Sequence, residues 1–104
     1  MSEAAVSTEH PLAPLRSQID EIDAQLLQLL ARRFVLTDEV GHYKAQQGLP
    51  PVDAEREAAQ MVRIAERATA LQVDPQLAQQ WFRLVIDRVV QRHREIADQQ
   101  HPVA

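Results

Sequence analysis

The chain has 104 residues, a formal net charge of −4 and no cysteine, so we expect one domain without disulfides or cysteine-based metal sites. The acidic balance argues against nucleic-acid binding, and the four scattered histidines lack metal-ligand spacing, so we expect no metal or other cofactor. The N-terminus lacks a signal peptide's basic start and apolar core, and no apolar run approaches the roughly 20 residues that span a membrane. These features predict a cytoplasmic protein that binds neither nucleic acid nor membrane.

The first predicted element is one long helix over residues 13–46. It follows a tail, residues 1–11, that is small and polar and that we expect to be disordered. Apolar residues recur along the helix at helical spacing: Leu15, Ile19, Ile22, Leu26, Leu29, Leu30 and Phe34. A helix of about 32 residues is about 48 Å long, and the later helices are too short to cover its apolar stripe. This length predicts a homodimer, although a helical hairpin within a larger heteromeric assembly would also cover the stripe.

Basic residues lie in line with the same stripe. Arg33 and Lys44 are 11 positions apart, about three helical turns, so they share nearly one face. A cation on an apolar face is costly unless an anion meets it, and the pair therefore predicts an anion site. Arg16 lies about 25 Å away along the axis and points about 100° around the helix from Arg33, so it suits a partner's site in an antiparallel dimer. Ordinary salt bridges, with Asp87 for Arg33 and Asp53 for Lys44, are the alternative.

A glycine- and proline-rich break at residues 48–51 precedes the second predicted helix, at residues 53–71. Asp53 has the position of an N-cap, with Arg56 and Glu57 in the first turn. Backbone N–H groups at a helix start also favour anions. Arg56 could therefore converge with the two cations of the first helix on one small anion.

Asp74 and Pro75 form a strong helix start, an N-cap followed by proline at the first helical position. They predict a third helix over residues 75–97, after which residues 98–104 are expected to fray. The chain is thus predicted to be all-α, with one long and two shorter helices and no strands.

Three segments together resemble one family. They are LRSQIDEIDAQLLQLLARRFVLTDEVGHYK, PVDAEREAAQ and WFRLVID. In order and spacing they resemble the all-helical (AroQ-class, type II) chorismate mutases. The resemblance lies in four features: the leading L-R-x-x-I-D-x-I-D, the R-R pair, the lysine and the D-x-x-R-E. The resemblance predicts a domain over residues 12–97, an intertwined homodimer of three-helix chains, and conversion of chorismate to prephenate in phenylalanine and tyrosine biosynthesis.

The resemblance also implies roles for the cations. Arg16 would reach into the partner's site, whereas Arg33, Lys44 and Arg56 would line the site of their own chain. Arg16 and Arg33 would hold the two carboxylates of chorismate, and Lys44 would donate to a carboxylate and to the ether oxygen. The pericyclic reaction needs conformational restriction and cations near the breaking C–O bond, with no nucleophile, metal or cofactor.

Four further positions complete the predicted site. By the same resemblance, Asp53 would accept a hydrogen bond from the ring hydroxyl, and Glu57 would sit near the ether or ring. Relatives commonly have a serine and a glutamine late in the third helix, where this chain has Val89 and His93. These two share one face, and we predict that His93 replaces the glutamine as donor; a place at the rim is its alternative.

Other functions remain compatible with the same fold. Isochorismate-pyruvate lyases use similar cations but tend to lack the acidic positions of Asp53 and Glu57, which favours the mutase. A 4-amino-4-deoxychorismate mutase stays open because of the altered pair at Val89 and His93. A non-catalytic, regulatory helical dimer is the third alternative, although it has no need for the four cations.

Overall fold

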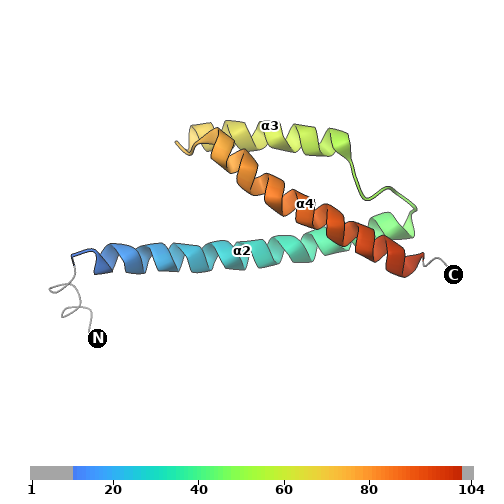
Figure 1. The fold of residues 1–104 in the computed structure, drawn as a ribbon, viewed down its shortest axis with the longest axis horizontal. Coiled ribbons are helices and arrows are strands. Elements are labelled where there is room, and N and C mark those ends of the chain that lie inside the picture. The colour runs from blue at the N-terminus through green and yellow to red at the C-terminus, as the bar shows by residue number, and fades with distance from the viewer. Residues whose placement is uncertain (1–10, 102–104) are drawn as a thin grey trace. The chain divides into compact units, whose positions relative to one another are not determined.

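The computed structural model describes residues 11–101 and contains three helices in that range: α2 (Ala13–Gln46), α3 (Ala54–Ala70) and α4 (Pro75–Gln100) (Figure 1). No strand occurs among these residues, so the predicted all-α class with one long and two shorter helices is confirmed. None of the helices in this range is long and apolar enough to cross a membrane. The tail predicted to be disordered lies outside the described residues, except for Pro11, which is in a turn.

The predicted helix starts are correct. Asp53 caps α3, and its Oδ1 accepts a hydrogen bond from the backbone N–H of Arg56 at 3.1 Å. Asp74 caps α4 in the same way, accepting from Gln76 N at 2.9 Å, and Pro75 follows it. Each cap satisfies a backbone donor that would otherwise lack a partner in the first turn.

The two ends that matter for the site are fixed by different means. α2 ends where Gly48 adopts a left-handed conformation (φ 68°), which glycine tolerates without a steric penalty. α4 continues to Gln100, three residues beyond the predicted helix end at residue 97. His101 accounts for the extra turn, because its Nε2 lies 2.8 Å from the carbonyl oxygen of Ala45. Residues 102–104 lie outside the described residues.

The chain divides into two units, Met1–Val35 and Leu36–Ala104, each of which we describe by itself. In the first unit, the described residues form the first part of α2. Seven of its apolar side chains are at least 49% exposed, whereas Leu30 and Phe34 are half-buried. The seven are Leu15, Ile19, Ile22, Leu26, Leu27, Leu29 and Val35. An exposed apolar stripe of this length is typical of a surface that another helix or chain can cover.

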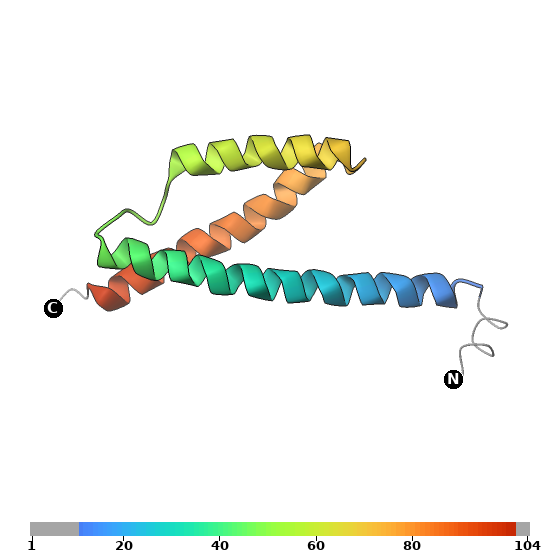
Figure 2. The same cartoon turned by 180° about the vertical axis from the view of Figure 1, so that it is seen from behind.

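In the second unit, α4 supplies most of the core. Its buried residues are Val85, Ile86, Val89, His93 and Ile96. The first half of α4 contacts α3, where Gln79 Nε2 donates to the carbonyl of Met61 at 3.1 Å. The second half of α4 lies beside the last part of α2 (Figure 2). There Arg92 forms an ion pair with Asp38, and the rings of His93 and His101 contact the carbonyl oxygens of Thr37 and Ala45.

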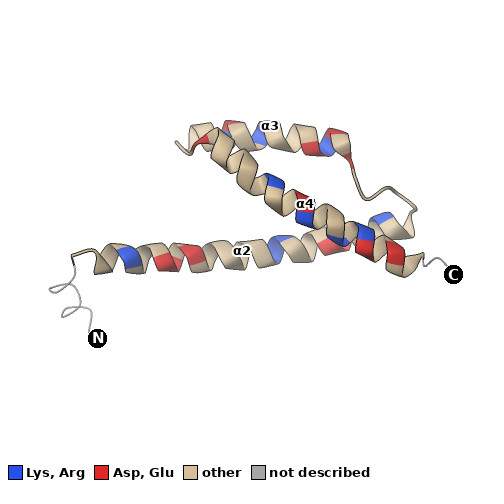
Figure 3. Cartoon of the chain, viewed as in Figure 1, with Lys and Arg blue, Asp and Glu red and all other residues tan. Residues whose placement is uncertain are grey.

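The start of α4 also carries an apolar surface. Leu77, Trp81 and Leu84 recur at helical spacing and are 58%, 43% and 72% exposed. Residues 75–82 contain no charge, as the tan start of α4 in Figure 3 shows. Trp81 packs edge-on against Phe82, with ring centroids 5.1 Å apart.

Candidate active site

The start of α3 presents two acidic groups and one basic group from the predicted site. Asp53 and Arg56 are exposed, and Glu57 is half-buried. The capping bond uses one carboxylate oxygen of Asp53 and leaves the other as an acceptor for a ligand. The helix start thus combines backbone N–H groups, one guanidinium and three carboxylates, those of Asp53, Glu55 and Glu57, within five residues.

Lys44 lies in the last turn of α2 and is half-buried. Its Nζ donates to the carbonyl oxygen of Pro51 at 3.3 Å, in the loop that leads into α3. Among residues 36–101 it forms no ion pair with Asp53, so the salt bridge considered from the sequence is absent there. A long bond to a neutral carbonyl leaves the ammonium charge uncompensated.

Glu57 forms an ion pair with Arg83, a residue that was not among the predicted site residues. Arg83 on α4 donates from NH1 to Glu57 Oε1 at 2.9 Å, and the same nitrogen lies 3.4 Å from Asp87 Oδ1. The hydrogen bond that Arg83 donates to Glu57 is the main reason that the pKa of Arg83 is raised; desolvation opposes the rise and Asp87 adds to it. Asp87, a possible partner of Arg33 from the sequence, therefore contacts Arg83.

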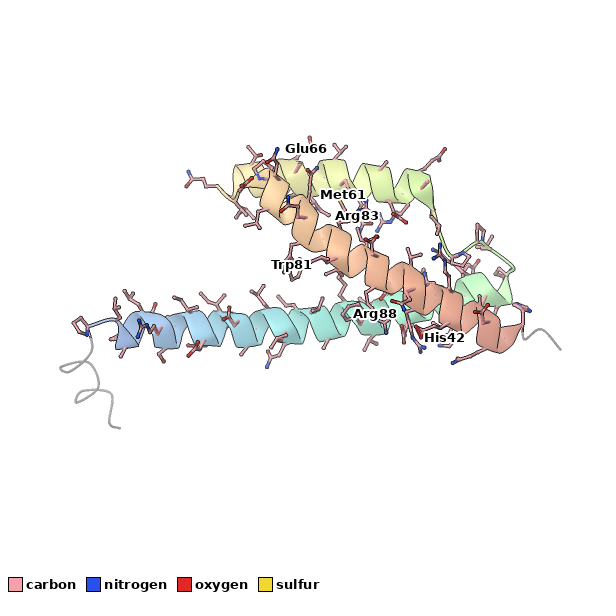
Figure 4. The ribbon with its side chains drawn as sticks, viewed as in Figure 1. His42, Met61, Glu66, Trp81, Arg83 and Arg88 are labelled. Carbon is pink, nitrogen blue, oxygen red and sulfur yellow. The ribbon has the colours of Figure 1, made fainter. Side chains whose placement is uncertain are left out.

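A pocket of about 300 Å³ opens beside this ion pair. Its walls come from the loop before α3, the first turn of α3 and the second half of α4. The lining residues are Val52, Glu57, Asp87, Val90 and Arg94. On α4, residues 83, 87, 90 and 94 follow one helical stripe. Figure 4 labels Arg83 at the start of this stripe, on the side of α4 that faces α3.

Val89 and His93 lie on the neighbouring stripe of α4 and are both buried, at 9% and 4% exposure. The Nε2 of His93 is 2.7 Å from the carbonyl oxygen of Thr37, whereas Nδ1 is buried without a hydrogen-bond partner among residues 11–101. The structure thus brings these two residues together, but into the contact with α2 and not into the lining of the pocket.

Several cations of the described residues have no carboxylate partner. Within residues 11–101, no ion pair includes Arg16, Lys44, Arg56 or Arg94, whereas Arg83, Arg88 and Arg92 all form ion pairs. Arg16 is exposed and Arg33 half-buried, both in the part of α2 that belongs to the first unit. No cluster of metal-ligand side chains occurs in the same range. The cations without carboxylate partners offer donors for an anionic ligand.

Residues 15–94 match the family model of type II chorismate mutases. The chain belongs to this family. The matched range contains all eight predicted site residues: Arg16, Arg33, Lys44, Asp53, Arg56, Glu57, Val89 and His93. It also lies inside the domain predicted at residues 12–97.

Three relatives illustrate the range of proteins that carry this domain. The chain is 37% identical over 76 residues to a chorismate mutase of Methanocaldococcus jannaschii, and it covers 77% of that protein. It is 44% identical over 75 residues to the T-protein of Enterobacter agglomerans, but it spans only 20% of that protein's length. It is 33% identical over 94 residues to the bifunctional chorismate mutase/prephenate dehydratase of Escherichia coli K12, of which it spans 24%.

Sequence reasoning missed the stripe of α4 that lines the pocket. The spacing of Arg83 and Asp87, four residues apart, is a local signal for an ion pair. Nothing local shows that Arg83 also faces Glu57, because 26 positions separate the two. Only the packing of α3 on α4 brings them together.

Proposed function

We propose that this chain is a chorismate mutase that converts chorismate to prephenate in the cytoplasm, on the way to phenylalanine and tyrosine. The observation that carries the proposal is the family match over residues 15–94, which includes every cation of the motif. The lack of carboxylate partners for Lys44 and Arg56 among the described residues supports it. Cations at a protein surface without internal partners are free to compensate a dianionic substrate.

In the proposed site, the substrate's two carboxylates meet Arg33 of one chain and Arg16 of its partner. Lys44 exchanges its 3.3 Å bond to Pro51 for a substrate carboxylate and the ether oxygen. This exchange is favourable because a hydrogen bond between two charged groups is stronger than one to a neutral carbonyl. Arg56 adds a second cation beside the helix start. As the C–O bond breaks, negative charge grows on the ether oxygen, and Lys44 is the donor that would stabilise it.

The acidic groups of the site define where the ring binds. In the proposal, Asp53 accepts from the ring hydroxyl through the oxygen that does not cap α3, and Glu57 lies near the ether or ring. A dianion tolerates these carboxylates only when neighbouring cations compensate them. Their presence favours a mutase over an isochorismate-pyruvate lyase of the same fold.

The proposal also keeps His93 as a donor to the ether oxygen and Val89 as its neighbour in the site. The role of His93 depends on which ring nitrogen carries a proton. If His93 donates from Nε2 to Thr37, a neutral ring has only an acceptor at Nδ1. A hydrogen bond from Nδ1 to the ether oxygen then needs the doubly protonated ring, or a move of Nε2 away from Thr37. Val89 offers no hydrogen bond and would pack against the ring.

The proposed assembly is a homodimer in which Arg16 serves the partner's site. Two exposed apolar surfaces support it. One is the stripe of α2 that includes Leu15, Ile22 and Leu29, and the other is formed by Leu77, Trp81 and Leu84 of α4. Covering such surfaces stabilises by about 25 cal/mol for each Å² removed from water.

No covalent step is needed for the proposed reaction. A rate enhancement of about 10⁶-fold corresponds to about 8 kcal/mol of transition-state stabilisation. Holding the substrate in its reactive conformation and stabilising the developing charge are together of that size.

The test offers the purified chain chorismate, isochorismate and 4-amino-4-deoxychorismate in turn and identifies the products. Prephenate from chorismate as the fastest reaction is expected. Faster release of pyruvate from isochorismate would replace the mutase by a lyase, and no turnover of any of the three would favour a regulatory dimer.

A matched pair of variants links the activity to the site. Arg33→Ala should abolish most of the turnover. Arg32→Ala, one position along α2 and exposed, should leave turnover close to that of the unmodified chain. Equal effects of the two substitutions would contradict the proposed site.

A further inference from the structure

Arg83 connects the first turn of α3 to α4 through a single nitrogen. Its NH1 lies 2.9 Å from Glu57 Oε1 and 3.4 Å from Asp87 Oδ1. The side chain of Glu57 is only 20% exposed, whereas those of Arg83 and Asp87 are 41% and 65% exposed. The short bond is thus the more protected of the two. Asp87, four residues further along α4, holds Arg83 from the other side.

This contact fixes Glu57 at the wall of the pocket. A glutamate side chain has several rotatable bonds and loses much freedom when it is ordered. Because Oε1 is bonded to Arg83, the orientation of the carboxylate is set before any ligand enters. Preorganisation of this kind lowers the entropy that binding and catalysis would otherwise lose.

The contact also balances charge. Glu57 and Asp87 both line the pocket, and two carboxylates at one wall would repel an anionic substrate. Arg83 contacts both carboxylates with one positive charge. Its pKa is raised above the ordinary value, chiefly by the hydrogen bond to Glu57, so it stays cationic wherever the carboxylates are ionised.

We propose that Arg83 is a positioning residue of the active site, which orients and compensates Glu57 while Asp87 anchors Arg83. This inference rests on the proposed function, because it gives Glu57 a place beside the substrate. Arg83 acts through Glu57 and does not touch the substrate itself. Losing Arg83 therefore matters only as long as Glu57 is present.

The test is a double-mutant cycle on turnover of chorismate. Arg83→Gln should lower kcat/KM by about two- to fivefold, the range expected for a partly exposed ion pair. In the Glu57→Gln background, the same substitution should have little further effect. Arg83→Lys should recover much of the loss, because one nitrogen makes both contacts and a lysine ammonium can replace it.

Arg88→Gln is the matched control. Arg88 lies on the same helix (Figure 4), and its ion pair with Glu95, at 3.5 Å, is exposed and contacts no predicted site residue. It should leave kcat/KM close to that of the unmodified chain. Thermal unfolding of all variants separates loss of activity from loss of structure.

Each outcome decides the proposal. An Arg83→Gln variant with the kcat/KM of Arg88→Gln overturns it, and so does an equal loss in both Glu57 backgrounds. If Arg83→Gln does not fold, Arg83→Lys in the same two backgrounds carries the test, and an equal change in both overturns the proposal. If the unmodified chain turns over no chorismate, the proposed function fails and this inference fails with it.

Discussion

Gly41 on α2 lies directly against the imidazole of His93 on α4. A Cβ placed on Gly41 would come within 2.6 Å of His93 Cδ2 and 2.9 Å of the terminal carbon of Ile96. The absence of a side chain at this position therefore allows the two helices to approach, and the histidine fills the space. His93 then reaches one turn back along α2, where its Nε2 meets the carbonyl of Thr37 at 2.7 Å.

The first prediction concerns this close approach. Gly41→Ala should destabilise the fold by about 1–2 kcal/mol, because overpacking a core costs about 1–3 kcal/mol and alanine returns up to about 1 kcal/mol of helix propensity. Urea unfolding measures the change. His93→Ala in the same chain removes the ring that alanine would meet, so the two substitutions together should cost less than the sum of their separate effects. Strict additivity would show that the helices adjust without this contact.

The second prediction separates the two roles of His93. If His93 is the ether donor, His93→Ala should lower kcat by at least about tenfold, at the low end of the effect of removing an oxyanion donor. His93→Gln, which restores an amide donor, should retain more activity than His93→Ala. Turnover of both variants and of the unmodified chain is compared from about pH 5 to pH 9. An unchanged kcat in His93→Ala, together with lower stability, would leave the residue a purely structural role.

Local sequence signals predicted the starts of α3 and α4 well because neighbouring residues set them. Asp53, Asp74 and Pro75 act within one turn, and the apolar period identifies α2 along its whole length. The end of α4 was placed too early because the bond from His101 to Ala45 spans 56 positions.

The site was less accessible from sequence, for a geometric reason. Family motifs identify Val89 and His93, but adjacent stripes of one helix differ by only about 100°. Which stripe faces the pocket depends on how α4 packs on both α3 and α2. In the structure, residues 87, 90 and 94 line the pocket, whereas residues 89 and 93 are buried in the core. No local pattern distinguishes these two arrangements.

The third prediction concerns the ion pair between Arg92 and Asp38, which ties α4 to the last part of α2. The guanidinium contacts both carboxylate oxygens, at 3.2 and 3.3 Å from Nε and at 3.2 Å from NH2. Arg92→Gln and Asp38→Asn should each lower the urea midpoint of unfolding, and the double variant should lower it by less than the sum. The coupling should weaken in high salt, since both side chains are partly exposed.

The same pair has a defined pH dependence. The hydrogen bond to Asp38 is the main reason that the pKa of Arg92 is raised. A group with a raised pKa contributes its stability fully below its unfolded value and loses it only as the pH rises through the folded value. Both values are far above neutrality, so titration of Arg92 should not change stability between about pH 6 and pH 9. A fall in unfolding free energy over that range that Arg92→Gln abolishes would contradict this assignment.

The last prediction tests whether one site is built from two chains. Arg16→Ala and Arg33→Ala should each be nearly inactive alone. If subunits exchange freely in an equal mixture, half of the dimers contain one chain of each kind. Each of these has one intact site and one doubly defective site, so the mixture should recover about a quarter of the unmodified activity.

The matched control mixes Arg33→Ala with Lys44→Ala, which the proposal assigns to the same site of the same chain. Every site in that mixture keeps a defect, so no recovery is expected. No recovery in the first mixture, once subunit exchange is verified, would contradict the assignment of Arg16 to the partner's site.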